Sequence, residues 1–239
     1  MRRGTIAGAA ALLLAVAGGA AAGGFSLSPV GLSIASRDPS ASLVARNTGD
    51  APIVIQARPM AWTQRNGKDV REESRDLIVN PPIFKLAPGE QQLVRVASRH
   101  GPPRDAEVAY RLIFSEIPPR EGTTSNPGFR LALAMDIPVY VEPVAARAPA
   151  PLQWRAERIG GGLRLSAENP GNVHYRIVEA RFSAAEATLR EQGILVVLPN
   201  SRLEIDVPAP PHAATVIHLS AEDGARLPVS VDIPIPPAP

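Results

Sequence analysis

Hydrophobic and polar residues alternate strictly along residues 129–141, near the middle of the chain. The odd-numbered positions of this stretch are all large and apolar, whereas the even-numbered positions are mostly small or polar. Alternate side chains of an extended strand share one face, so the pattern predicts a β-strand with one long apolar face. That face has to be buried in the strand's own core, against a neighbour or in another protein.

Short apolar runs separated by turn residues fill the rest of the N-terminal half. The 26 prolines and 19 glycines are spread along the chain, which favours short strands over long helices. Pro29 and Gly31 are expected to break the first strand, and Asn66-Gly67 predicts a hairpin turn. About seven strands before residue 143 are typical of an immunoglobulin-like sandwich.

The composition changes after residue 143. Residues 144–151 are rich in proline and alanine and are predicted to be a short, stiff linker. A second series of short strands follows, with residues 184–192 interpreted as either a short helix or a loop. We therefore predict an all-β protein of two immunoglobulin-like β-sandwich domains, over 23–143 and 152–239.

The N-terminus has the pattern of an export signal. Arg2 and Arg3 precede an apolar run over residues 6–17, and three alanines at 20–22 form a small-residue cleavage site. An uncleaved membrane anchor is the alternative, but the run is shorter than the roughly 20 residues that span a bilayer. Residues 1–22 are therefore predicted to be a cleaved signal peptide.

Charge and cysteine content exclude several classes of function. Without Arg2 and Arg3 the mature chain has 23 basic and 23 acidic residues, so it lacks the basic excess that is typical of nucleic-acid binding. Cysteine is absent, which excludes disulfides and thiolate metal sites. An exported chain of this kind depends on its hydrophobic core for stability.

No pattern of catalytic residues stands out. The histidines lie in no metal-ligand or triad motif and are expected to be solvated; they are His100, His174, His212 and His218. Glu116 and Asp136 are single carboxylates on different predicted strands, not an acid–base pair. Phosphate-binding and nucleophile-elbow motifs are also missing. The sequence thus predicts no enzyme activity, no cofactor and no metal.

Arg95 and Arg111 are the unusual charges, because each interrupts an apolar strand. A charge is costly there unless it is paired or reaches water. One interpretation places each guanidinium at a sheet edge in contact with solvent. The other makes it a receptor for a carboxylate, which a guanidinium binds with two parallel hydrogen bonds.

Several stretches, in order, resemble one protein family. Residues 83–96, 110–118 and 131–143 look like the periplasmic pilus chaperones of the chaperone–usher pathway, and 168–174 is similar as well. The resemblance covers essentially the whole mature chain. It implies a periplasmic, non-catalytic protein whose two domains form an angled, boomerang-like molecule with a cleft.

The resemblance also implies a function. Such a chaperone binds a pilus subunit that lacks its last strand, lends it a strand by donor-strand complementation, and delivers it to an outer-membrane usher. The implied donor side chains are Phe129, Leu131, Leu133 and Met135. Ala132 and Ala134, on the opposite face, are expected to point into the chaperone.

The sequence departs from the family at one place. The well-known branch anchors the subunit's C-terminal carboxylate with two basic residues, which align here with Gly31 and Pro138. Neither binds a carboxylate, and residues 136–141 instead look like the archaic branch. Our hypothesis is that Arg111, or as second choice Arg95, supplies the anchor.

The sequence leaves two other functions open. A secreted two-domain β-sandwich adhesin or surface structural protein is the alternative, although a pilus subunit would be a single incomplete sandwich. A carbohydrate-binding module would need exposed aromatic platforms, and Trp62 and Trp154 are expected to be core residues instead.

Overall fold

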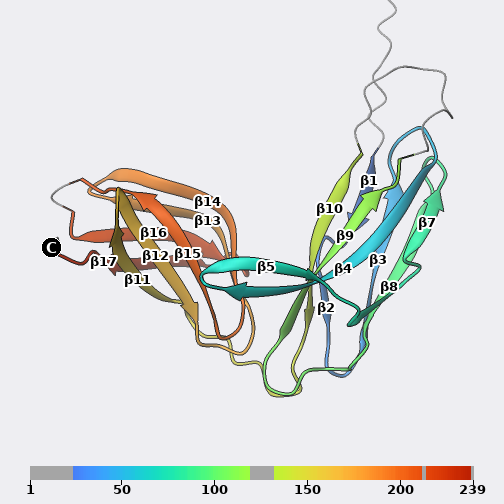
Figure 1. Ribbon diagram of the computed structural model, residues 1–239, viewed down its shortest axis with the longest axis horizontal. Helices are drawn as coiled ribbons and strands as arrows, with labels where there is room; N and C mark the ends of the chain where they lie inside the picture. The colour runs from blue at the N-terminus through green and yellow to red at the C-terminus, as the bar shows by residue number, and fades with distance from the viewer. Residues whose placement is uncertain (1–23, 119–131, 212–213, 238–239) are drawn as a thin grey trace, which may run out of the picture.

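The computed structural model describes residues 24–118, 132–211 and 214–237. Over these ranges every regular element is a β-strand, and the seventeen strands form four sheets. Figure 1 shows two lobes that meet at an angle, β1–β10 in one and β11–β17 in the other. The described residues include no helix long and apolar enough to cross a membrane.

The N-terminal lobe is a sandwich of two sheets. The first sheet has the order β1 (Phe25–Ser28), β3 (Ser40–Asn47), β8 (Gln91–Ser98) and β6 (Leu77–Asn80). The second has the order β2 (Leu32–Ile34), β10 (Ala134–Val141), β9 (Val108–Glu116), β4 (Ile53–Arg65) and β5 (Lys68–Glu73), and β7 (Ile83–Leu86) also pairs with β4.

The core of this lobe lies between the two sheets. Val94 from the first sheet and Leu112 and Phe114 from the second are completely buried in it. Ile137 and Val139, which belong to the alternating stretch, are buried in the same core. Burying a side chain of this kind stabilises the fold by about 1.5–3 kcal/mol.

The predicted break in the first strand is confirmed. β1 ends at Ser28 and pairs with β3, whereas β2 begins at Leu32 and pairs in parallel with β10. The chain therefore crosses from one sheet to the other at residues 29–31. Proline lacks an amide hydrogen for the ladder, which explains why pairing stops there.

The predicted Asn-Gly hairpin is also confirmed. Asn66 and Gly67 have φ values of 53° and 73°, the left-handed conformation that a two-residue hairpin turn needs. They join β4 to β5. In Figure 1 this hairpin projects from the N-terminal lobe toward the other lobe.

The C-terminal lobe is a second sandwich. One sheet has the order β11 (Gln153–Ile159), β12 (Gly162–Asn169) and β15 (Ser201–Pro208). The other has the order β14 (Ala187–Val197), β13 (Tyr175–Ala184), β16 (Val216–Asp223) and β17 (Pro228–Pro234). Phe182 is completely buried between the sheets, and the partly buried Trp154 packs its ring edge-on against it at 5.7 Å.

The helix or loop considered for residues 184–192 is wrong. Ala185 and Glu186 form a tight turn with φ values of 45° and 64°, and β14 runs from there back along β13. Local propensity allows a helix in this alanine- and glutamate-containing segment. The antiparallel ladder with β13 outweighs that weak preference.

The segment between the last strand of one lobe and the first of the other is held by hydrogen bonds. The amide of Val144 donates to the carbonyl of Pro103 at 2.8 Å. Asn172 donates from Nδ2 to Ala146 O at 3.0 Å and accepts from the amide of Ala148 at 2.7 Å. Both lobes thus bind this segment, while the predicted domain limits at 143 and 152 stay predictions.

Candidate functional site

The alternating stretch lies partly within the described residues. Phe129 and Leu131 lie outside them. Leu133 and Met135 are partly buried and pack against the core of the N-terminal lobe.

The expectation that Ala132 and Ala134 point into this lobe is wrong, because both are exposed. Since side chains alternate along a strand, Met135 shares the face of the buried Ile137. The row of large apolar residues therefore continues the lobe's own core, and the alanines lie on the other face.

β10 has an open edge. It pairs with β9 along its whole length, but on its other side β2 pairs only with Val139, Tyr140 and Val141. Within the described part of the chain, residues 134–138 therefore have no strand on that side. An unpaired strand edge is a template for pairing with another chain.

The direction of the β10 amides can be deduced from one hydrogen bond. The amide of Glu142, just after β10, donates to Ile34 O at 2.9 Å, on the side of β2. Alternate residues of a strand present their amides to the same side, so those of Ala134 and Asp136 face the open edge. Pro138 falls in the same series, which explains why it does not interrupt the ladder with β9.

Gly31 and Pro138, the positions of the basic pair in the well-known branch, lie side by side. A Cβ atom on Gly31 would lie 3.4 Å from Cγ of Pro138. The two aligned positions are therefore neighbours in the structure, although neither residue carries a charge.

A charged group lies beside them. Arg111 is the β9 residue opposite Pro138, and its Nε donates to Oδ1 of Asp136 at 2.7 Å. Nη1 of Arg71, on β5, donates to Oδ2 of the same carboxylate at 2.6 Å. The three side chains have a formal net charge of +1.

Arg111 is held by packing as well as by charge. Its guanidinium lies 4.9 Å from the centre of the Trp62 ring, a favourable cation–π distance, and only 17% of its side chain is exposed. Trp62 is buried, as predicted, but between the lobes, with Ala109, Tyr140 and Leu198, and not inside a sandwich.

Arg95 lies elsewhere. It is on β8, in the other sheet of the lobe, and is exposed beside Ser42 and Asn80. Its guanidinium is in contact with water, although β8 is an inner strand of its sheet. The structure does not bring Arg95 and Arg111 together.

Comparison with known proteins identifies the family. Residues 24–147, more than half of the chain, match the family described as the pili and flagellar-assembly chaperone, PapD N-terminal domain. The chain belongs to this family.

Curated relatives of this PapD-type family cover part of the chain. Chaperone protein PapD of Escherichia coli is 24% identical over 165 residues, which are 66% of this chain and 65% of PapD. Chaperone protein caf1M of Yersinia pestis is 28% identical over 158 residues, 57% of this chain and 58% of caf1M. The chain spans about three fifths of the length of the curated relatives it matches.

Solved structures of the PapD type show the same fold over most of the chain. A chaperone–tip subunit complex of archaic Csu pili from Acinetobacter baumannii has a TM-score of 0.69 at 21% identity and covers 88% of this chain and 98% of the other. The Salmonella enterica SafA pilin–SafB chaperone complex has a TM-score of 0.62 at 17% identity and covers 89% and 96%.

The lobe interface of this PapD-type chain contains a buried pair that sequence analysis missed. Glu107, 6% exposed, accepts from the backbone amide of His174 at 3.1 Å and lies 2.7 Å from its Nδ1. The ring of Tyr140 stacks on His174 with centres 3.7 Å apart. Burial, reinforced by the charge of Glu107, raises the pKa of Tyr140.

The expectation of solvated histidines is therefore wrong for His174, because its ring lies between the lobes. His100 and His218 are exposed, as predicted, and His212 lies outside the described residues. The described part of the chain has no group of three residues that could hold a metal ion.

Proposed function

We propose that the chain is a periplasmic chaperone that binds pilus subunits by donor-strand complementation through β10 and delivers them to an outer-membrane usher. The open edge of β10 at residues 134–138 is the observation that carries this proposal. Membership of the PapD-type family supports it, and the predicted signal peptide supports a periplasmic location. The activity is binding, without a chemical reaction.

The physical basis is strand addition. A subunit that lacks one strand exposes a hydrophobic groove and an unpaired edge, both of which promote aggregation. The β10 edge supplies backbone hydrogen bonds, and the apolar row supplies side chains for the groove. Because Leu133 and Met135 adjoin the chaperone's own core, the subunit would extend that core.

The Arg111 site is our proposed receptor for the subunit's C-terminal carboxylate. This proposal is supported by the position of Arg111, whose guanidinium is held by Asp136 and Trp62. Arg111 lies opposite Pro138 in the sheet, and Gly31 lies beside Pro138. Arg71 adds a second cation that the sequence did not reveal. One bound carboxylate would neutralise the net charge of +1. Arg95 has less support because it is exposed on the other sheet.

Replacing Leu131 and Leu133 by serine tests the donor strand. We expect the double variant to lose copurification with a co-expressed pilus subunit, which the wild type should bind one to one, while the chaperone keeps its circular dichroism spectrum. The matched control is Leu93→Ser with Leu227→Ser, two leucines exposed by 47% and 60% away from β10. Normal binding, or unfolding of the test variant, would contradict the proposal.

Replacing Arg111 by alanine tests the anchor. A charge-assisted hydrogen bond contributes about 1.5–3 kcal/mol, so we expect subunit affinity to fall by roughly 10- to 100-fold. The variant and the wild type should bind a subunit with an amidated C-terminus with equal affinity. If Arg111→Ala and Arg95→Ala both bind like the wild type, no anchor of this kind exists.

A further inference from the structure

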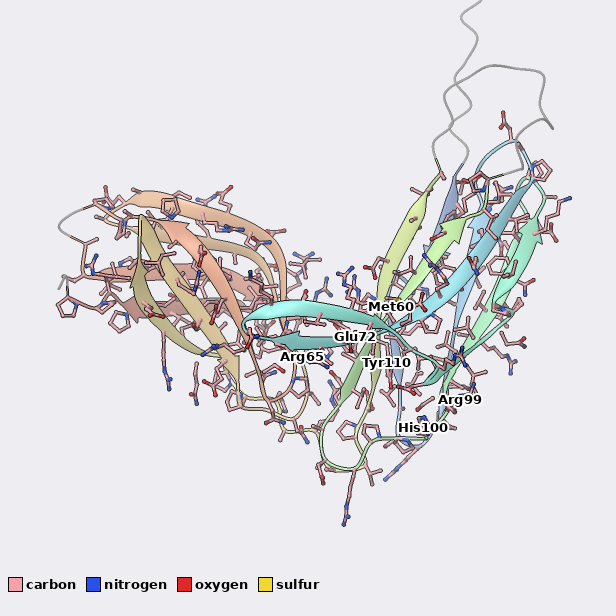
Figure 2. The ribbon with its side chains drawn as sticks, in the orientation of Figure 1. Met60, Arg65, Glu72, Arg99, His100 and Tyr110 are labelled. Atoms are coloured by element: carbon pink, nitrogen blue, oxygen red, sulfur yellow. The ribbon has the colours of Figure 1, made fainter. Side chains whose placement is uncertain are left out.

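The tip of the β4–β5 hairpin is buried. Gly67 in the turn is buried, whereas its neighbours Asn66 and Lys68 are exposed. Turn tips normally lie in solvent, so a buried tip is docked against something. Figure 2 shows the hairpin between the two lobes, where it is marked by Arg65 and Glu72, whose side chains approach to 3.6 Å.

The tip docks on β15 of the other lobe. Gly67 O accepts a hydrogen bond from the amide of Glu204 at 2.8 Å. The side chain of Glu204 covers the glycine so closely that a Cβ atom on Gly67 would lie 2.4 Å from its Cδ. A side chain at position 67 would therefore force Glu204 to move.

Gln64 makes the second contact, with β14. Its Nε2 donates to Val196 O at 2.8 Å, and its Oε1 accepts from the amide of Leu198 at 2.9 Å. Nε2 also donates to Oδ1 of Asp69 at 2.9 Å, so each polar atom of the amide has a partner of the right kind. The side-chain amide thus pairs with the end of β14 as the peptide group of a neighbouring strand would.

Apolar packing continues the contact toward the Arg111 site. The side chain of Leu198 is 4% exposed and packs in one cluster with Trp62 and Tyr140. Trp62 lies two residues before Gln64, on the same face of β4. The hairpin contact and the surface that holds Arg111 are therefore one continuous interface.

We propose that Gln64 is a positioning residue that fixes the angle between the two lobes, with the β4–β5 hairpin acting as an interlobe clasp. The linker segment and the Glu107–His174 pair also join the lobes, and the clasp adds contacts from the tip of the hairpin to β14 and β15. Two bodies joined by several different contacts cannot pivot freely about any one of them. This inference concerns the chain's own geometry and does not depend on the proposed function.

Distance measurement between the lobes tests the clasp. The chain has no cysteine, so Ser42→Cys on β3 and Ser230→Cys on β17, both exposed, allow spin labelling without other changes. We expect double electron–electron resonance to give one narrow distance distribution, which Gln64→Ala broadens. Gln56→Ala, in the same strand but paired only within its own lobe, should leave it narrow.

Conservative variants sharpen the test. Gln64→Glu keeps the acceptor for Leu198 but loses the donor to Val196 O, so we expect intermediate broadening. Asp69→Asn keeps the side-chain length but weakens the orientation of the amide, so we expect slight broadening. A distribution that stays as narrow in Gln64→Ala as in the wild type would overturn the proposal.

A pair of glycine variants separates docking from backbone strain. Gly67 and Gly89 have φ values of +73° and +76°, but a Cβ atom on Gly89 would meet nothing within 4 Å. We expect Gly67→Ala to broaden the distance distribution and Gly89→Ala to leave it unchanged, although both variants bear the same backbone strain. Equal distributions for the two variants would also contradict the clasp.

Discussion

At the scale of single residues, two buried asparagines make the same set of hydrogen bonds, one in each lobe. Asn47 and Asn169 are both completely buried. Each donates from its side-chain amide to two backbone carbonyls and accepts from the amide of the glycine two positions later. For Asn169 the two carbonyls are those of Val173 and Val197, both at 2.9 Å. Each asparagine thus closes the turn that follows a strand.

Removing either asparagine should be costly. Asn169→Ala leaves two buried carbonyls without donors, so we expect the free energy of unfolding to fall by about 2–3 kcal/mol in urea titrations. Asn169→Asp keeps the acceptor for Gly171 but faces the two carbonyls with a charge, and should be at least as destabilising. A loss below about 0.5 kcal/mol for both variants would contradict this account.

The tyrosines should titrate at high pH. Burial, with the nearby Asp76, raises the pKa of Tyr110 to about 12, and burial also raises the pKa values of Tyr140 and Tyr175. The unfolded chain has tyrosine pKa values near 10, so the folded state loses stability as the pH rises from 10 toward 12. Tyrosinate absorbance should rise above pH 10 in buffer and near pH 10 in urea, and equal midpoints would refute this.

Some of the residues of the candidate site could be predicted from the sequence. Arg111 stood out because a charge interrupts an apolar strand. Arg71 did not, because it lies in a charged, exposed segment and meets Asp136 only through the pairing of distant strands. Glu107 and His174 were missed for the same reason, since each is ordinary in its own segment.

At the scale of elements, β10 combines two environments in one strand. Alternation predicted the strand, and the structure confirms it over Ala134–Val141. The sequence pattern could not show which part of the edge is open. That depends on where the chain crosses between sheets, at residues 29–31, and β2 covers only the C-terminal part.

Hydrogen exchange should reveal this division. We expect the amides of Ala134 and Asp136 to exchange fast in the free protein and to become protected in a subunit complex. The amide of Tyr140, which lies opposite Ser33 of β2, should be protected in both states. Uniform protection along β10 in the free protein would show that its edge is already covered.

At the scale of the whole molecule, two sandwiches were predictable but their interface was not. Strand spacing and turn residues indicated two all-β units, and the two pairs of sheets in the structure confirm them. The interface brings together Trp62, Glu107, Tyr140, His174 and Leu198, which are scattered over more than half of the chain. No local pattern links such residues.

Glu107→Ala should loosen this interface. It leaves the amide and ring of His174 without their buried partner, so we expect a loss of about 1–3 kcal/mol in the free energy of unfolding. Glu72→Ala, which removes a carboxylate with 58% of its side chain exposed, is the control and should change stability by less than about 0.5 kcal/mol. Similar stabilities for the two variants would show that the buried pair contributes nothing.

The placement of Pro138 on β10 has a consequence for any strand that pairs there. Ala134 and Asp136 offer backbone hydrogens to the open edge, and Pro138, next in the series, offers none. Beyond it β2 already occupies the side of the strand. The pairing of an added strand with β10 would therefore have to end at Pro138.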